Sequence, residues 1–382
     1  MKKLFYFAAA AVALAACAKN EVVPVNSGEN QEITFNVAPK TKGTVPSTDP
    51  SYTVPSTDPR YFNENNHFVS YAYFRGEGNE WPGTVGQIYI DAADISFADN
   101  KWKAASTYYW PKSDKSSLTF FAWSTNSDRT TLTDATVSCN SKSGISVSDY
   151  DVIENKNVDL LVADVAANRH ANGAKYSHIG VPTLFRHKLS YLIFNVKTAA
   201  DYKTKDGKVF FINSITLRGF DLEGDYSQNA DNKTSTDPSP IVYDKTGYWS
   251  NFKGKNANET TLSEQQYFNS TGGVEFGKDV MSLDATAGVD QKYYLPQNIT
   301  ATGDPSSTTD YTIEVVYTIK TTEASTETTE TVTKYIKASE IYGEKWEINK
   351  KYTCTLTFSL DEIYWDPAVE EWTPGTVSSD VK

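Results

Sequence analysis

The chain has 382 residues and is poor in the residue types from which most catalytic and metal sites are built. It contains three cysteines, four histidines and two methionines. Three cysteines in a chain of this length exclude a disulfide scaffold and most cysteine-ligated metal sites. The sequence also lacks a P-loop, a dinucleotide-binding glycine motif and a G-x-S-x-G nucleophile motif. We therefore predict a protein that is not an enzyme and that holds no metal ion or cofactor.

Basic residues are also scarce. Lysine and arginine together number 36 against 48 aspartates and glutamates, so the formal net charge is −12. A nucleic-acid-binding protein needs a basic face or stripe to neutralise phosphates. The charge balance therefore excludes nucleic acid as a partner.

Long apolar runs are absent as well. The most extended run covers residues 4–16, which is thirteen residues, and a membrane-spanning helix needs about twenty. It follows Lys2 and Lys3, which form a short basic region at the start of the chain. This order is typical of a secretory signal peptide and not of a membrane anchor.

The signal peptide ends in Leu14-Ala15-Ala16-Cys17, which resembles the lipobox of bacterial lipoproteins. We predict cleavage between Ala16 and Cys17, acylation of Cys17 (palmitate included), and attachment to the outer membrane through several acyl chains. The alternative is an ordinary signal peptide followed by a cysteine that stands there by chance. Residues 17–31 are polar and aperiodic, so we predict a flexible tether.

Aromatic residues are abundant, with 24 Tyr, 18 Phe and 8 Trp, and aromatic side chains favour strands. Apolar and polar residues alternate along many short segments, as in strands that bury one face. Ile33, Phe35 and Val37 share one face of the first such segment. Others cover residues 68–74, 118–123, 189–196, 209–217, 311–319, 331–336 and 352–360. We predict an all-β chain of two β-sandwich domains, residues 32–186 and 187–382.

Polar stretches interrupt these segments. Residues 41–60 contain the heptapeptide Thr-Val-Pro-Ser-Thr-Asp-Pro twice, and its prolines cannot donate to a ladder. We predict an exposed, extended loop there. Residues 221–239 and 251–272 are also predicted to be loops. The Thr/Glu-rich residues 320–330 are predicted to be the loop of a hairpin.

Several segments, taken in order, resemble the fimbrillin family of Bacteroidales, whose members are lipoprotein precursors of type V pili. The resemblance rests on Tyr108-Tyr109-Trp110-Pro111, Leu118-Thr119-Phe120-Phe121-Ala122-Trp123, Asp159-Leu160-Leu161-Val162-Ala163, Leu184-Phe185-Arg186-His187-Lys188-Leu189, Phe194-Asn195-Val196, Tyr294-Leu295-Pro296-Gln297 and Ile363-Tyr364-Trp365-Asp366-Pro367 with Trp372. Together with the lipobox, these segments cover nearly the whole chain.

The resemblance implies two transthyretin-like β-sandwich domains in a lipid-anchored precursor at the cell surface. It further implies that a surface protease removes the first strand, which opens a groove in the N-terminal domain. A strand of another fimbrial subunit then fills the groove by β-strand addition. The protein would thereby join a fimbrium, homopolymeric or heteropolymeric, that acts in adhesion through a receptor the sequence does not identify.

Carried over to this chain, the removable strand has Ile33, Phe35 and Val37 as its buried side chains. Arg60 is the candidate maturation cleavage site, and Lys40 and Lys42 are rivals if the protease accepts lysine. Without the resemblance, Arg60 is a solvated charge in a loop.

The candidate donor side chains are Ile363, Trp365, Val369 and Trp372, within a candidate donor tail at residues 363–382. The alternative is that they form the last strand of their own domain. A tail that cannot donate would make the protein a tip or accessory subunit and not a stalk subunit.

A second hypothesis is a surface glycan-binding lipoprotein in which exposed Trp81, Trp102 or Trp249 stack on sugar rings. Tryptophans are equally common in sandwich cores. His170 and His178 do not have the spacing of a zinc site, and we interpret both as exposed loop residues.

His187 is predicted to be a hydrogen-bonded structural residue. Cys139 and Cys354 leave two alternatives open: they form a disulfide in an oxidising compartment, or Cys354 is a buried free thiol. The second alternative rests on phase, because Cys354 alternates with Tyr352 and Leu356 on an apolar strand face.

Overall fold

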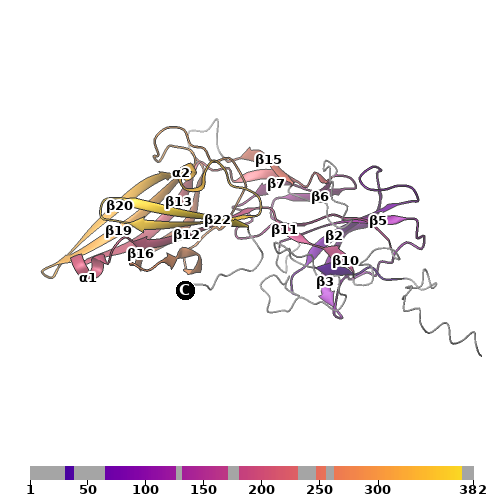
Figure 1. The fold of residues 1–382 in the computed structure, drawn as a ribbon, viewed down its shortest axis with the longest axis horizontal. Helices are drawn as coiled ribbons and strands as arrows, with labels where there is room; N and C mark the ends of the chain where they lie inside the picture. Colours follow the sequence, from indigo (N-terminus) through magenta and orange to yellow (C-terminus); the bar gives the residue numbers. More distant parts are fainter. Residues whose placement is uncertain are drawn as a thin grey trace, which may run out of the picture.

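The computed structural model describes residues 31–37, 65–125, 131–170, 180–230, 247–254 and 262–371. The chain is elongated, with strands of the N-terminal half gathered at one end and strands of the C-terminal half at the other (Figure 1). The described strands form four sheets, so the predicted all-β class is confirmed.

The first sheet has nine strands and lies in the N-terminal half. Its order is β10 (Val181–Thr183), β1 (Phe35–Val37), β4 (Lys101–Ala104), β3 (Gln87–Ala98), β2 (Phe68–Arg75), β5 (Ser117–Ser124), β8 (Leu161–Ala163) and β11 (Phe185–His187), with β9 (Ala166–Arg169) paired to β5. Along β5, Leu118 and Phe120 face one core while Phe121 and Trp123 face another. The first sheet is therefore apolar on both faces, which explains the nearly unbroken apolar run in β5.

The second sheet is built from strands of both halves. Its order is β15 (Tyr248–Lys253), β14 (Glu223–Ser227), β7 (Gly144–Asp151) and β6 (Thr136–Asn140). β14 and β7 are antiparallel, with Tyr226 opposite Val147. Tyr226, Trp249 and Leu222 pack into the core between the first and second sheets.

Strand pairing therefore crosses the predicted domain boundary. The division into residues 32–186 and 187–382 stays a proposal, and the first of these segments holds only two of the four strands of the second sheet. The prediction of loops over residues 221–239 and 251–272 is wrong for β14, for β15 and for β16 (Glu264–Phe276). The sequence pattern missed them because β14 and β15 bury few large side chains and are otherwise polar.

The C-terminal half contains the third and fourth sheets. The third has the order β17 (Met281–Ser282), β12 (Ser190–Thr198), β21 (Lys350–Phe358) and β22 (Ile363–Glu371), with β18 (Tyr293–Tyr294) paired to β12. The fourth has the order β16 (Glu264–Phe276), β13 (Lys208–Arg218), β19 (Thr312–Glu323) and β20 (Thr326–Lys337). A core that includes Phe194, Ile215 and Tyr317 fills the space between them.

The Thr/Glu-rich stretch is strand and not loop. β19 and β20 pair up to Glu323 opposite Thr326, and the turn consists of Ala324 and Ser325, both with positive φ. Two-residue turns of this kind match the twist of a hairpin. The predicted loop over residues 320–330 is therefore wrong, because threonine favours strands and this end of the hairpin is exposed.

Helices contribute little to the described fold. α1 (Tyr202–Asp206) begins after Asp201, whose side chain accepts a hydrogen bond from the N–H of Thr204. α2 (Ala338–Tyr342) buries Ile341 and Tyr342, and η2 (Leu283–Ala285) is a single 3₁₀ turn. These short helices connect consecutive strands.

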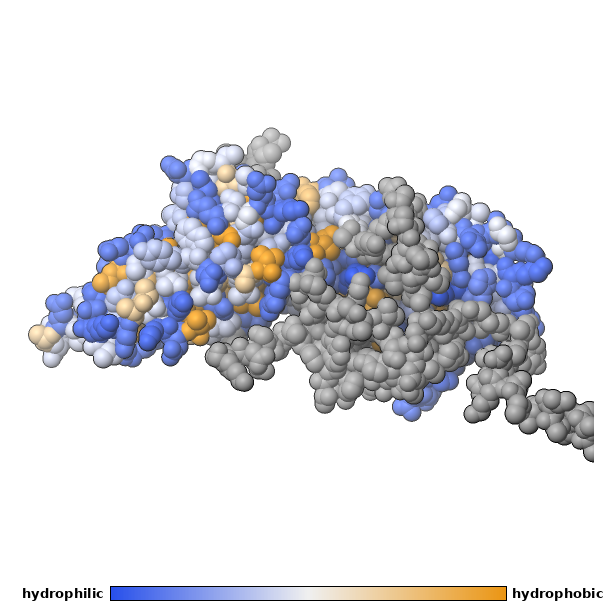
Figure 2. Space-filling view, in the orientation of Figure 1, coloured by the Kyte–Doolittle hydropathy of each residue, from blue (hydrophilic) through white to orange (hydrophobic). Residues whose placement is uncertain are grey.

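The surface carries scattered apolar residues. In the view of Figure 2, hydrophobic residues form small patches surrounded by hydrophilic ones. Among the described residues, the large hydrophobic side chains that are exposed include Val85, Ile88, Val280, Tyr364 and Val369. Single apolar residues on a surface are ordinary, so this pattern by itself marks no binding site.

Candidate functional site

The first strand lies inside the first sheet, between β10 and β4. Its pairing with β10 is parallel, with Phe35 opposite Val181, and its pairing with β4 is antiparallel, with Phe35 opposite Trp102. The N–H of Ile33 donates to the carbonyl of Tyr108 at 2.8 Å, which extends the contact towards the N-terminus. Residues 31–37, which we call the plug, are thus hydrogen-bonded on both sides.

Two side chains of the plug are core residues. Ile33 and Phe35 are 3% and 5% exposed, whereas Val37 is half-buried. The ring of Phe35 meets Phe68 and Phe120 edge-on, with ring centroids 5.4 Å and 5.9 Å apart. Burying an isoleucine or phenylalanine side chain contributes about 1.5–3 kcal/mol. The plug therefore fills two apolar sockets in the N-terminal half.

Loss of the plug would leave an acceptor for another strand. Among the described strands, β10 has β1 as its only hydrogen-bonded neighbour. Without β1, backbone groups of β10 and β4 would lack partners and the two sockets would be empty. Exposed strand edges of this kind are templates for pairing with another chain. A replacement strand must run in the same direction as β1, parallel to β10 and antiparallel to β4.

Gly180 allows the plug and β10 to approach each other closely. A Cβ at this position would lie 2.7 Å from the carbonyl carbon of Phe35 and 2.9 Å from the nitrogen of Asn36, and its φ is +102°. The neighbouring Val181 donates its N–H to the carbonyl of Thr34 at 2.7 Å. Any side chain at position 180 would push the two backbones apart.

We expect Gly180→Ala to lower the free energy of unfolding of the intact chain by about 2–5 kcal/mol, because backbone strain adds to the clash with the plug. Gly78→Ala is a matched control, since Gly78 has φ +74° and a Cβ added there would meet nothing within 4 Å. Gly78→Ala should lower the free energy of unfolding only by the backbone strain, about 1–2 kcal/mol. Denaturant unfolding measures both. Equal losses would contradict tight packing of the plug against Gly180.

An exposed ion pair joins the plug to β4. Glu32 of the plug lies 3.6 Å from the Nζ of Lys101 on β4, with the two side chains 30% and 55% exposed. An ion pair this exposed is worth at most about 1 kcal/mol. The ion pair therefore contributes little to the stability of the plug in its sheet.

The candidate donor strand is β22, at the edge of the third sheet. It pairs with β21 along its full length, from Ile363 opposite Phe358 to Glu371 opposite Lys350. Ile363 is buried, and Trp365 is half-buried and donates its Nε1–H to the carbonyl of Glu340 at 3.2 Å. In this structure, then, the segment is an edge strand of its own sheet.

β22 is held by few side chains. Of its residues with a described side chain, Ile363 and Trp365 contact the core, and the others are exposed, including Val369 at 51%. Of the predicted donor side chains, Ile363 and Trp365 therefore pack against the same core, whereas Val369 is exposed to solvent. Trp372 lies outside the described residues. A strand anchored at two positions can leave its sheet at a smaller cost than a central strand.

Two hydrogen-bonded pairs of side chains join the residues that flank β8 to β11. Arg186 makes two hydrogen bonds to Asp164, at 2.5 Å and 2.7 Å, and His187 Nδ1 lies 2.6 Å from Asp159. His187 and both carboxylates are buried. The prediction that His187 is structural and hydrogen-bonded is confirmed. Its partner was not foreseen, because Asp159 stands 28 positions away and no local pattern links the two.

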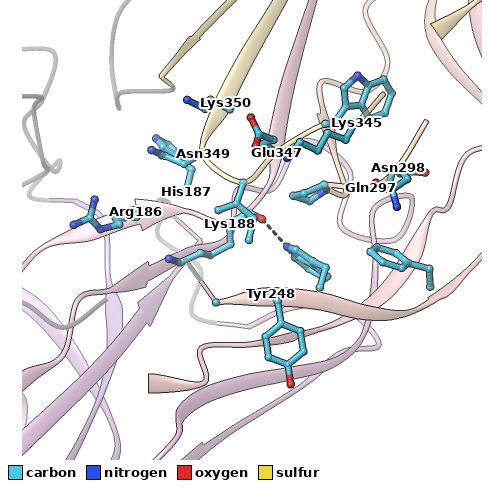
Figure 3. A pocket seen from close by; sticks show the side chains of 16 residues that line it. Arg186, His187, Lys188, Tyr248, Gln297, Asn298, Lys345, Glu347, Asn349 and Lys350 are labelled. Carbon is cyan, nitrogen blue, oxygen red and sulfur yellow. Dashed lines mark hydrogen bonds and ion pairs between the residues drawn. The ribbon is translucent and has the colours of Figure 1, made fainter. Parts of the chain in front are cut away.

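A cleft of about 570 Å³ lies near the end of β11 and is lined by β15 and by residues 296–298 and 345–350. Figure 3 shows Gln297, Asn298 and Glu347 on one side of β15, while the ring of Tyr248 points away from them. Trp249 lines the cleft but is 8% exposed and donates its Nε1–H to the carbonyl of Lys188 at 2.7 Å. The cleft thus presents no free tryptophan face.

The expectation of an exposed tryptophan for sugar stacking is wrong at all three positions. Trp81, Trp102 and Trp249 are 5%, 8% and 8% exposed, and each belongs to a core cluster. Trp102 packs on one face of the first sheet, and Trp81 and Trp249 pack into the core between the first and second sheets.

Several predicted positions lie outside the described residues. These are Ala16 and Cys17, the tandem repeat, Arg60 with its rivals Lys40 and Lys42, and His178. Lipidation and maturation cleavage therefore stay predictions. His170 is described, and its Nδ1 lies 2.8 Å from the carbonyl of Ser116.

Cys139 and Cys354 are both free thiols. Burial raises the pKa of the Cys354 thiol to about 12, and the nearby Asp366 carboxylate contributes in the same direction. Nowhere in the described ranges do three or more metal-ligating side chains gather as a metal site would require. None of the helices formed by the described residues is long and apolar enough to span a membrane.

A family model described as fimbrillin-like matches residues 56–372. No curated protein sequence matches the chain. Among solved structures, the chain is similar to a fimbrial protein from Bacteroides vulgatus, at 18% identity and a TM-score of 0.53, over 90% of this chain and 100% of that one. At this identity the likeness bears on the fold alone.

Two further solved structures are similar over the same extent. A putative cell adhesion protein from Bacteroides uniformis has 16% identity and a TM-score of 0.44, over 90% of this chain and 99% of that one. The tip fimbrial protein Mfa3 from Porphyromonas gingivalis, truncated at its C-terminus, has 7% identity and a TM-score of 0.31, over 90% and 100%.

Proposed function

The chain belongs to the fimbrillin-like family, and on this basis we propose that it is a structural subunit of a cell-surface fimbrium that acts in adhesion. It is not an enzyme in this proposal, and its partners are other fimbrial subunits. Its role is to polymerise and to carry an adhesive filament away from the cell surface.

The observation that supports assembly by strand exchange is the position of the plug. It lies between β10 and β4, and its Ile33 and Phe35 fill sockets of the core. A surface protease removes it, and a strand from a neighbouring subunit takes its place. The incoming strand regains the backbone hydrogen bonds and the apolar contacts that the plug made.

The location of donor and acceptor favours an open filament. The groove belongs to the first sheet, in the N-terminal half, and the candidate donor β22 belongs to the third sheet, in the C-terminal half (Figure 1). A contact between two different surfaces of the same chain is head-to-tail. Such contacts extend into filaments unless the rotation between subunits happens to close a ring.

The precursor is held at the outer membrane by acyl chains on Cys17, and cleavage after Arg60 releases the plug. Lys40 and Lys42 are the alternative cleavage sites. Mass spectrometry of the cell-surface form tests both parts of this scheme. A polypeptide that begins at acylated Cys17 is the precursor, and one that begins at Tyr61 is the mature subunit.

Limited digestion of the purified chain with a trypsin-like protease tests the assembly. We expect cleavage before β2, loss of residues 32–37 from the folded product, and conversion of monomers into oligomers on size-exclusion chromatography. Arg60→Gln, Lys40→Gln and Lys42→Gln, made singly, identify the site. Monomers alone after cleavage, with residues 32–37 still bound, would contradict the proposal.

A further inference from the structure

The fourth sheet ends in a long edge strand, β20, whose only hydrogen-bonded neighbour among the described strands is β19. The two strands pair without a bulge along all twelve residues of β20, as far as Thr312 opposite Lys337. The first six residues of β20 are exposed. Its outer side, which we call the open edge, makes no backbone hydrogen bond to any other described segment. An edge of this kind is a template for pairing with another strand.

Two other long edge strands carry features that discourage such pairing. β16, at the opposite edge of the fourth sheet, contains Gly272 and Gly273 and is bulged at two places against β13. β22 contains Pro367, which has no N–H to donate. β20 has no bulge, no glycine and no proline. Its remaining protection is charge, and the order of its charges decides which partner it accepts.

The hairpin geometry fixes which residues of β20 face the open edge. Glu323 and Thr326 flank a two-residue turn, and residues in that position form a hydrogen-bonded pair. Alternate residues from Thr326 onwards therefore bond to the β19 side, as the N–H of Ala338 does when it donates to the carbonyl of Tyr311 at 2.9 Å. The residues between them, at odd-numbered positions from 327 to 337, direct their N–H and C=O groups to the open edge.

Two open edges can therefore pair in antiparallel fashion only if odd-numbered residues lie opposite odd-numbered ones. The possible registers differ by shifts of two residues, and in each of them one residue lies opposite its own copy at a twofold axis. The registers centred near the middle of β20 have residue 330, 331, 332, 333 or 334 on this axis.

One of these registers pairs every charged side chain of β20 with an opposite charge. In it, Val332 lies opposite itself. Glu330 then faces Lys334, and Glu327 faces Lys337. Registers centred on residue 330 or 334 bring like charges together, and the remaining two place no charged residues opposite each other. Opposite charges directly across two strands stabilise their pairing, and like charges destabilise it.

The four charged side chains are accessible for these contacts. Glu330, Lys334 and Lys337 form no ion pair with any other described residue. Glu327 lies 3.4 Å from the Nζ of Lys320 on β19, but the two side chains are 57% and 40% exposed. An ion pair this exposed contributes little to stability, so Glu327 can exchange it for a contact with another copy.

We propose that the open edge of β20 docks on the open edge of β20 in a second copy of this chain, in antiparallel orientation, with Val332 on the twofold axis. Because both copies use the same surface, the contact closes on itself and joins two copies only. The inference does not depend on the proposed function, since the uncleaved single chain carries the edge. β20 and β10, which borders the plug, lie in opposite halves of the molecule (Figure 1). In a filament of the proposed kind the edge recurs in every subunit, so many weak contacts would join two filaments side by side.

Disulfide trapping with one introduced cysteine per chain tests the register. We would prepare the full, uncleaved chain with Cys17→Ser and Cys139→Ser, which leaves the buried Cys354, and add Val332→Cys. In the proposed register the two copies of residue 332 form a pair that is not hydrogen-bonded, with Cα atoms about 4.5 Å apart and within disulfide reach. Thr331→Cys and Thr333→Cys are matched controls. Both control positions are exposed whereas Val332 is half-buried, so random collisions would favour the controls.

We expect gentle oxidation to give at least about tenfold more disulfide-linked dimer from Val332→Cys than from either control. A residue next to the axis meets its own copy only diagonally, at about 7–8 Å, which is beyond disulfide reach. Dimers of equal or greater yield from a control, or no dimer from Val332→Cys, overturn the proposal. Because the chain is uncleaved, neither result bears on strand exchange at the groove.

Exchange of charges gives a second test, made in the Val332→Cys chain. Glu327→Lys/Glu330→Lys makes the edge wholly basic. Lys334→Glu/Lys337→Glu makes it wholly acidic. Each variant alone is expected to form at least about tenfold less dimer, because its opposite-charge pairs become like-charge pairs.

An equimolar mixture of the basic and acidic variants is expected to restore the dimer, because every pair across the twofold axis is again of opposite charge. One of the two chains carries an affinity tag, so the mixed dimer is recognised by its size on a non-reducing gel. Near-UV circular dichroism checks that both variants are folded. Folded variants whose mixture does not link, or that each dimerise as well as the parent chain, overturn the proposal.

Discussion

Replacing Phe35 with alanine is expected to lower the free energy of unfolding of the intact chain by about 3–5 kcal/mol. Phe35 is 5% exposed, meets two other aromatic rings edge-on and belongs to a strand paired on both sides. The truncation removes these contacts and leaves a cavity that the neighbouring rings fill only in part. Denaturant unfolding followed by tryptophan fluorescence measures the loss, since Trp102 and Trp110 belong to the same core.

Val37→Ala is the matched control for this substitution. Val37 lies in the same strand but is half-buried at its end, so its truncation should cost about 1 kcal/mol or less. The same pair of variants bears on function, because a weakened plug should leave the groove faster after cleavage. Losses of equal size from the two variants would mean that the plug is not part of the core, and strand exchange would lose its driving force.

Residues 31–187 expressed alone are expected not to fold. The core between the first and second sheets takes Leu222, Tyr226 and Trp249 from beyond this segment, together with Leu189 and Leu295. Burial of these five side chains contributes about 7–15 kcal/mol, which is as large as the whole stability of a typical domain. Without β14, moreover, β7 would present an unpaired edge.

Near-UV circular dichroism and thermal unfolding measure this outcome, with the full chain as the positive control. We expect no cooperative transition from residues 31–187, and a return of the near-UV signal when residues 188–371 are added as a separate polypeptide. A cooperative transition from residues 31–187 alone would show that the N-terminal half is an independent domain. In that case the pairing of β14 with β7 would be a contact between domains and not a part of either.

The plug and β22, the candidate donor strand, are held in their sheets in different ways. The plug is paired on both sides and buries two large side chains, whereas β22 is paired on one side and contacts its core at Ile363 and Trp365. The plug thus depends on buried side chains and on pairing at both edges, whereas β22 depends on a long ladder with β21, from Ile363 to Glu371. In the proposed scheme, a protease frees the plug, and β22 has to give up its ladder with β21 before it can enter a groove.

The sequence alone determined the strands with a buried face. Ile33 and Phe35, the aromatic run from Leu118 to Trp123, and the alternation through Tyr352 and Cys354 all mark strands, because side chains point to opposite faces at every second residue. The same rule identified Cys354 as buried. It failed for the polar edge strand β15 and for the exposed residues 326–330 of β20, which bury too little to show a period.

Only the tertiary structure decided which strands are neighbours. β1 pairs in parallel with β10, some 146 positions later (Phe35 opposite Val181), and β14 pairs with β7 across the expected domain boundary. The register of a strand depends on partners far away in the chain, so no local pattern encodes it. The position of the plug between β10 and β4 is therefore a property of the folded chain. The sequence pattern shows which side chains are buried, and only tertiary packing decides between which strands they lie.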